Sequence, residues 1–170
     1  IQVPRRVRPE TGHVSNATSP MLAAQAAAAG AASFELGIAR DDVYELRTLI
    51  GFGLEADVLV LSGGVSAGVL DLVPGVLEAL GVRQVFHKVS VKPGKPLWFG
   101  VKGDNAQAKL VFGLPGNPVS SLVCFELFVR PAIARLAGRS GGGLAETTAV
   151  LASEFTHRGD RPTYHPARLS

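Results

Sequence analysis

Two spacings of apolar residues recur along the chain, one typical of buried strands and the other of amphipathic helices. Short apolar or alternating runs bounded by turn residues predict strands at 32–38, 58–61, 84–91, 97–101 and 109–112. Longer runs with apolar residues three or four apart predict helices at 20–29, 42–50, 71–80 and 118–137. Because strands alternate with helices, we expect an α/β fold with three layers, αβα, around a mostly parallel (mixed) sheet.

The ends of these helices carry typical capping residues. Ser19 is expected to cap the first helix, and Asp41 or Asp42 the second. Asn117 is expected to cap the last helix. Within that helix, Pro131 should cause a kink or a break, because proline lacks the N–H group that the helix needs.

A glycine-rich stretch, GRSGGG at 138–143, reads as a flexible linker. The pieces after it, 145–155 and 163–169, are strand-like but too short to fold alone. The α/β domain is therefore expected to end before the linker.

Composition favours one substantial core, since 46% of the 170 residues are hydrophobic and 18% are charged. No apolar run reaches the roughly 18 residues of a membrane span.

The start has neither an initiator Met nor an apolar signal core, so we expect an internal cut through a longer protein. The lone Cys124 excludes an internal disulfide, fits a reducing, cytoplasmic compartment, and reads as a buried small hydrophobe.

The net charge is only +3, but all five lysines lie between residues 88 and 109. Localised positive charge favours an anionic ligand or an acidic partner. Nucleic acid is disfavoured, because aromatic residues make up 6% of the chain and no nucleic-acid signature is present.

Three loops are candidates for binding that anion. Residues 62–68, SGGVSAG, join a strand to a helix, where free backbone N–H groups and the helix dipole favour an anion. A plain tight turn that needs glycine for its geometry alone is the alternative. In KPGKP at 92–96, Lys92 and Lys95 flank a stiff turn, which suggests oxyanion binding or a solvated hairpin tip. Asp71 could hold a divalent cation or simply begin a helix.

The third loop is GLPGNPVS at 113–120, in which Asn117 could cap a helix or read a polar ring system. Because this loop and the glycine loop both follow strands and precede helices, we expect them to meet on one edge of the sheet, with KPGKP nearby. Asn16 and Thr18 could face the same site or merely form turns. The histidines lack metal-ligand spacing, and His87 reads as structural.

With these residues in view, the chain resembles the molybdopterin molybdenumtransferase family, which includes bacterial MoeA and the gephyrin E domain. The resemblance is carried by SGGVSAG followed by Asp71, by VKPGKPLWFG at 91–100 and by FGLPGNPVSSLVCFELFVRP at 112–131. It covers roughly residues 12–170. It implies a molybdopterin-binding domain at 1–139, and at 144–170 the first strands of a small C-terminal β-barrel subdomain.

The resemblance also implies an activity: inserting molybdenum from molybdate into adenylylated molybdopterin with release of AMP, assisted by Mg²⁺. Asp71, Lys92 and Lys95 would be catalytic, and Asp71 would also hold the metal. The residues that would bind the pterin are Asn16, Ser62, Gly63, Gly64, Ser66, Pro115, Gly116, Asn117, Pro118 and Ser120. The implied partners are a second protomer in a homodimer and the adenylyltransferase of the same pathway, with no nucleic acid and no membrane.

The chain departs from the family pattern in four respects. Val69 stands where the family usually has an acidic residue, and Asn16-Ala17-Thr18 replaces an Asn-Ser-Asn or Asp-Ser-Asn sequence. From the resemblance, we expect the family's elongated amino-terminal subdomains, and the first strand just before residue 1, to lie outside this sequence. We therefore expect the chain alone to bind weakly and to catalyse little.

Other functions stay open on sequence grounds. A molybdopterin adenylyltransferase-like domain would share the fold and the glycine loop, although KPGKP and GLPGNP argue against it. A non-catalytic molybdopterin-binding or scaffolding module is a second alternative. A generic nucleotide-binding α/β domain is a third, and the missing dinucleotide and Walker fingerprints count against it.

Overall fold

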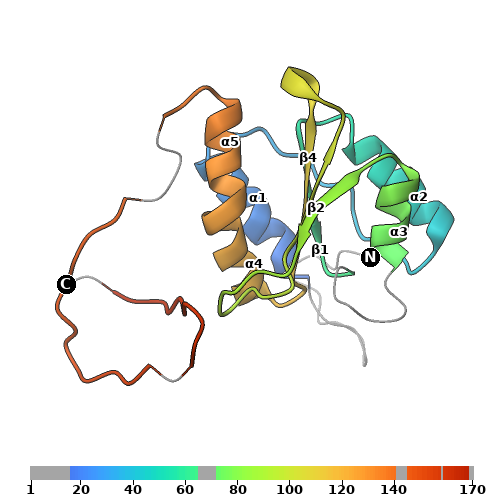
Figure 1. Ribbon diagram of the computed structural model, residues 1–170. Coiled ribbons are helices and arrows are strands. Elements are labelled where there is room, and N and C mark those ends of the chain that lie inside the picture. Colours follow the sequence, from blue (N-terminus) through green and yellow to red (C-terminus); the bar gives the residue numbers. More distant parts are fainter. Residues whose placement is uncertain (1–15, 65–71, 141–144, 158, 169–170) are drawn as a thin grey trace, which may run out of the picture.

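A computed structural model describes residues 16–64, 72–140, 145–157 and 159–168 of the chain (Figure 1). Its elements in chain order are α1 (Thr18–Ala28), α2 (Val43–Gly53), β1 (Val58–Ser62), α3 (Leu72–Ala79), β2 (Arg83–His87), β3 (Trp98–Lys102), η1 (Asn105–Gln107), β4 (Lys109–Leu114), α4 (Pro118–Cys124), η2 (Phe125–Val129) and α5 (Arg130–Leu136). Among the described residues, no helix combines the length and the apolar character needed to cross a membrane.

The four strands form one mixed sheet in the order β1-β4-β3-β2. β1 and β4 run parallel, whereas β3 is antiparallel to β4 and β2 is antiparallel to β3. The helices cover both faces, with α1, α4 and α5 on one side and α2 and α3 on the other (Figure 1). The expected three-layer αβα fold with a mixed sheet is confirmed.

Alternating strand residues divide the core between the two faces of the sheet. Leu59 and Val111 face α2 and α3, whereas Phe112 and Leu114 face α1, α4 and α5. The chain's only tryptophan, Trp98, belongs to the first of these clusters and is 2% exposed. Its indole N–H donates to Gln84 Oε1 at 2.8 Å, so that the polar atom of this buried ring is satisfied.

The first helix begins differently from the prediction. Ser19 is not its cap, because the Asn16 side chain accepts hydrogen bonds from the N–H groups of Thr18 and Ser19, both at 3.2 Å. The prediction for α2 is confirmed, since the Asp42 carboxylate accepts from the Glu45 N–H at 2.8 Å. In both cases a side-chain oxygen satisfies N–H groups that the first helical turn leaves free.

Two regions predicted as strands are not assigned to strands in the part of the chain that the structure describes. One is the stretch 32–38, which connects α1 to α2 without forming a strand. Residues 145–157 likewise form no strand, and the later piece contributes one isolated bridge, between Thr163 and Lys92. A strand needs a neighbour for its backbone groups, which an apolar pattern alone does not supply.

The last helical run extends without interruption from 118 to 136, as α4, η2 and α5. Pro131 does not break it. Instead, the five residues Phe125–Val129, just before the proline, adopt π-helical geometry. Proline has no backbone N–H, so one hydrogen bond of the helix is missing. The π turn accommodates this loss without ending the helical run. Asn117 caps this run as predicted.

Candidate functional site

The glycine loop follows β1 and is tied to the end of β4. The Gly63 N–H donates to the Leu114 carbonyl oxygen at 3.1 Å. Gly63 and Gly64 have φ values of +82° and +66°, a region that L side chains rarely adopt, so these glycines are required by the turn. Ser66 and Asp71, predicted to bind pterin and metal, lie outside the described residues.

The second loop, 115–117, lies against the first. A Cβ added at Gly116 would be 3.7 Å from the Gly63 Cα, so the two backbones are close neighbours. The Ser121 hydroxyl donates to the Pro115 carbonyl and holds the loop onto α4. Asn117 accepts from the N–H groups of Val119 and Ser120 at 3.0 and 3.2 Å, which confirms the capping role.

The third loop, KPGKP, is held between the sheet and α4. The Lys88 N–H donates to Leu97 O at 2.7 Å, and the Val89 N–H donates to Lys95 O at 2.9 Å, which extends the β2–β3 pairing toward the turn. Gly94 has a φ of +120° and packs so closely on Cys124 that an added Cβ would be 2.5 Å from the thiol sulfur.

The Cys124 side chain therefore packs directly against the KPGKP turn. It has no exposed surface, and burial raises the pKa of its thiol to about 11. A thiol that stays protonated at neutral pH is a poor nucleophile. The prediction of a buried, structural cysteine is confirmed.

Strand register brings all three loops to one edge of the sheet, namely the edge formed by the ends of the strands rather than by an outer strand. Ser62 is level with Leu114 in the parallel β1–β4 pair, and Trp98 is level with Gly113 in the antiparallel β3–β4 pair. The start of β3 therefore lies beside the carboxyl ends of β1 and β4. Lys102 lies at the opposite end of β3, beside Lys109. Two of the five lysines, Lys92 and Lys95, thus lie in the turn that precedes β3 at this edge.

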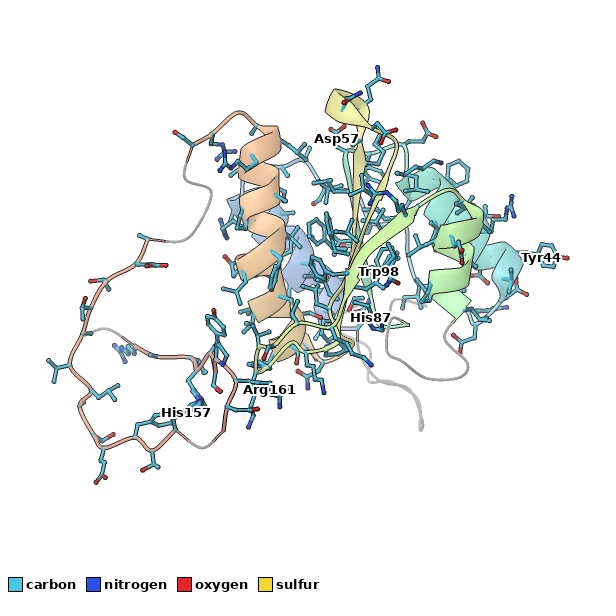
Figure 2. All side chains as sticks on the ribbon, viewed as in Figure 1. Tyr44, Asp57, His87, Trp98, His157 and Arg161 are labelled. Atoms are coloured by element: carbon cyan, nitrogen blue, oxygen red, sulfur yellow. The ribbon has the colours of Figure 1, made fainter. Side chains whose placement is uncertain are left out.

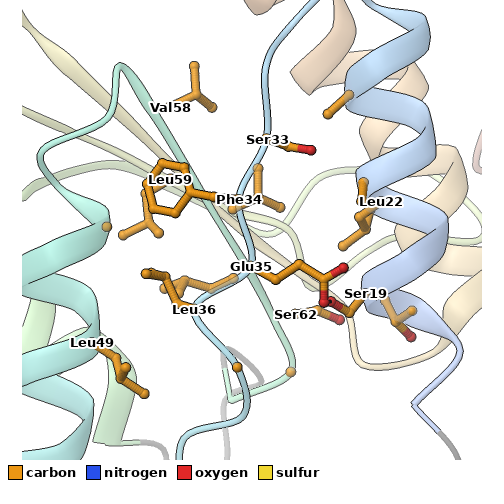
Figure 3. A pocket seen from close by; sticks show the side chains of 18 of the residues that line it. Ser19, Leu22, Ser33, Phe34, Glu35, Leu36, Leu49, Val58, Leu59 and Ser62 are labelled. Carbon is orange, nitrogen blue, oxygen red and sulfur yellow. The ribbon is translucent and has the colours of Figure 1, made fainter. Parts of the chain in front are cut away.

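A cavity of about 1260 Å³ opens between β1 and the extended segment 31–41 (Figure 3). Its lining includes six of the predicted pterin-binding residues: Asn16, Ser62, Gly63, Gly64, Gly116 and Pro118. Leu36, Leu59 and Leu61 line it as well, so it also has an apolar part. Lys92, Lys95, Pro115, Asn117 and Ser120 are not among the lining residues.

One polar contact in this cavity has no counterpart in the sequence analysis. The Ser19 hydroxyl donates to the Glu35 carboxylate at 2.6 Å (Figure 3). The signal that could have pointed to it is Glu35, the single charged residue in the run 31–38. In the described part of the chain, no three His, Cys, Asp or Glu side chains gather closely enough to hold a metal ion.

Comparison with known proteins matches residues 5–135 to the family described as "Probable molybdopterin binding domain". The chain belongs to this family. As a molybdopterin-binding domain, it is similar to proteins named molybdopterin molybdenumtransferase. It is 38% identical over 117 residues to the one from Synechocystis sp., and 46% identical over 106 residues to the one from Haemophilus influenzae.

These matches cover 69% and 62% of the chain, but the chain spans only 26% and 25% of the relatives' own length. Among solved structures, the molybdopterin-binding domain is similar to a molybdopterin biosynthesis MoeA protein from Pyrococcus horikoshii. The TM-score is 0.69 at 36% identity, over 82% of this chain and 33% of that one. The likeness to the tungsten cofactor synthesizing protein MoaB from Pyrococcus furiosus, at 15% identity and a TM-score of 0.55, shows the fold alone.

Proposed function

We propose that this chain forms the pterin-binding part of a molybdopterin molybdenumtransferase, which inserts molybdenum from molybdate into adenylylated molybdopterin and releases AMP. The observation that carries the proposal is the meeting of the 62–64, 92–96 and 115–118 loops at one edge of the sheet. In open α/β sheets this edge, beyond the carboxyl ends of parallel strands, is where ligands bind.

The chemistry of this edge suits a large anion. Lys92 and Lys95 place two ammonium groups in one turn, and the repulsion between them falls when phosphate or molybdate oxygens lie between them. The helical run that begins at Pro118 directs its positive dipole end toward the same edge. Gly63, Gly64 and Gly116 leave room for a ligand to reach the backbone.

Magnesium is proposed as a further requirement, with Asp71 as its protein ligand. Mg²⁺ typically takes one or two carboxylates and completes its shell with phosphate oxygens and water, so a single aspartate beside a phosphorylated pterin suits it. The ion would neutralise phosphate charge. Asp71→Asn should therefore remove the dependence of pterin-nucleotide binding on Mg²⁺ concentration, while binding in the absence of Mg²⁺ stays at the wild-type level.

The proposal extends to the assembled protein. We propose a cytoplasmic homodimer, in which the second protomer completes the site, and which receives adenylylated molybdopterin from the adenylyltransferase of the same pathway. The support is the family membership together with the short share of the relatives' length that this chain spans. Sedimentation of the full-length protein, alone and with that adenylyltransferase, tests both associations.

The experiment that tests the proposed function is calorimetric titration of the chain with adenylylated molybdopterin. Lys92→Ala and Lys95→Ala should each weaken binding about 10- to 100-fold, because each removes a charge-assisted hydrogen bond. Lys102→Ala is the matched control, since it removes the same charge at the far end of β3. Equal losses in all three variants would indicate a general charge effect, and no binding by the folded wild-type chain would contradict the proposal.

A further inference from the structure

The KPGKP turn receives backbone hydrogen bonds from a part of the chain far along the sequence. The Lys92 N–H donates to Pro162 O at 2.9 Å, and the Tyr164 N–H donates to Lys92 O at 2.7 Å. These two bonds flank the parallel bridge between Lys92 and Thr163. Residues 162–164, here named the anchoring segment, thus satisfy both backbone groups of the first lysine in the turn.

The two lysines of the turn are held by different partners. The backbone of Lys95 is fixed through the Val89 N–H, as part of the β2–β3 pairing. The backbone of Lys92 has its partners in the anchoring segment. The position of the Lys92 ammonium group therefore depends on residues beyond the glycine-rich linker, and that of Lys95 does not.

The anchoring segment is itself held in shape by local contacts. The Thr163 hydroxyl donates to Arg161 O at 3.1 Å, and it lies 3.0 Å from His157 Nε2. The rings of Phe155 and His165 meet edge to face, with centroids 4.8 Å apart. Figure 2 shows Arg161 where this segment meets the turn.

We propose that residues 162–164 are positioning residues for the anion site: they hold Lys92 in the place where it binds the oxygens of the substrate. The inference rests on the proposed function, because it assumes that Lys92 contacts the pterin nucleotide. It assigns a role in the molybdopterin-binding site to the region after the linker.

The test compares two substitutions at one position. Tyr164→Pro removes the N–H that donates to Lys92. Tyr164→Ala removes the ring but keeps the N–H, at a residue that is 43% exposed. A proline here also favours an extended Thr163, which suits its bridge. We expect Tyr164→Pro to weaken binding of adenylylated molybdopterin about three- to tenfold. Tyr164→Ala should bind like the wild-type chain.

A double-mutant cycle separates positioning from a general structural effect. In the Lys92→Ala background, Tyr164→Pro should cause no further loss of affinity, whereas in the Lys95→Ala background its full effect should remain. Amide hydrogen exchange gives a readout that needs no ligand: the Lys92 amide should exchange faster in Tyr164→Pro than in Tyr164→Ala.

Three outcomes would overturn the inference. Equal affinity and equal Lys92 protection in the two Tyr164 variants would show that the anchoring segment does not position the lysine. An undiminished effect of Tyr164→Pro in the Lys92→Ala background would show that it acts by another route. If the folded wild-type chain does not bind at all, the proposed function fails first and the positioning role fails with it.

Discussion

At the scale of single residues, the Glu126 carboxylate connects α1 to the last helical run. It accepts from Gln25 Nε2 at 2.6 Å and from the Arg130 guanidinium, which also donates to the Ala28 carbonyl at the end of α1. Burial acts to raise the pKa of Glu126, but hydrogen bonds from Arg130 and Gln25 and the charge of Arg130 outweigh it and hold the pKa below its usual value. Charged Glu126 therefore stabilises the fold.

Glu126→Gln should lower the free energy of unfolding at pH 7 by about 1–2 kcal/mol. A carboxyl with a lowered pKa in the folded state stabilises above its unfolded pKa, and the contribution is lost as the pH falls through the folded value. The difference between variant and wild type should therefore shrink below about pH 4. Urea unfolding across pH measures it, with the exposed Glu78→Gln as control. A difference independent of pH would contradict the prediction.

Close packing at Gly94 leads to a second prediction at this scale. Gly94→Ala combines a strained positive φ with a clash against the Cys124 sulfur, and it should cost about 2–3 kcal/mol of stability. Cys124→Ala removes the sulfur, so the double variant should be more stable than the sum of the single effects by about 1 kcal/mol. Chemical denaturation of the four proteins checks this, and additive effects would show that the clash is relieved elsewhere.

At the scale of the elements, the Asn117 cap allows a structural role to be separated from a binding role. Asn117→Asp keeps the side-chain oxygen that accepts from Val119 and Ser120, whereas Asn117→Ala loses it and should cost about 1 kcal/mol. If Asn117 also contacts the pterin, both variants should bind more weakly, while only the alanine variant loses stability. Wild-type affinity in Asn117→Asp would limit this residue to capping.

The elements also show what the sequence could predict and what it could not. Helix ends such as Asp42 and Asn117 were predictable, because capping is a contact within one turn. The strand predicted at 32–38 was wrong, since pairing depends on a distant neighbour that a local pattern does not reveal. The predicted meeting of the glycine and GLPGNP loops is confirmed, because both follow parallel strands. The contact between Lys92 and Tyr164 carried no local signal.

At the scale of the whole molecule, the cavity beside β1 leads to a prediction about one further strand. Crossovers between parallel strands are right-handed, so successive crossovers in opposite directions along a sheet place their helices on opposite faces. α1 and α2 do lie on opposite faces of the sheet (Figure 1). If a strand preceding α1 pairs with segment 32–39 on one side and with β1 on the other, the connections through α1 and α2 run in opposite directions. We therefore expect that strand between the segment and β1, where the cavity lies.

Extending the chain at its amino end with the upstream strand of a full-length relative should fill this cavity. We expect a higher melting temperature and slower hydrogen exchange at the β1 amides that face away from β4. The control is the same extension with prolines in the strand, because proline cannot donate to a ladder. Unchanged exchange in the extended chain would contradict the expected position.

The single tryptophan provides an intrinsic fluorescence probe of this molecule. Trp98 is buried, and it stands two residues after Pro96, at the base of the lysine turn. Its intrinsic fluorescence should therefore change when the chain unfolds, and again when an anion settles at the turn and alters the field around the indole. Folding, and the effect of Tyr164→Pro on it, can thus be followed by tryptophan fluorescence without an added label.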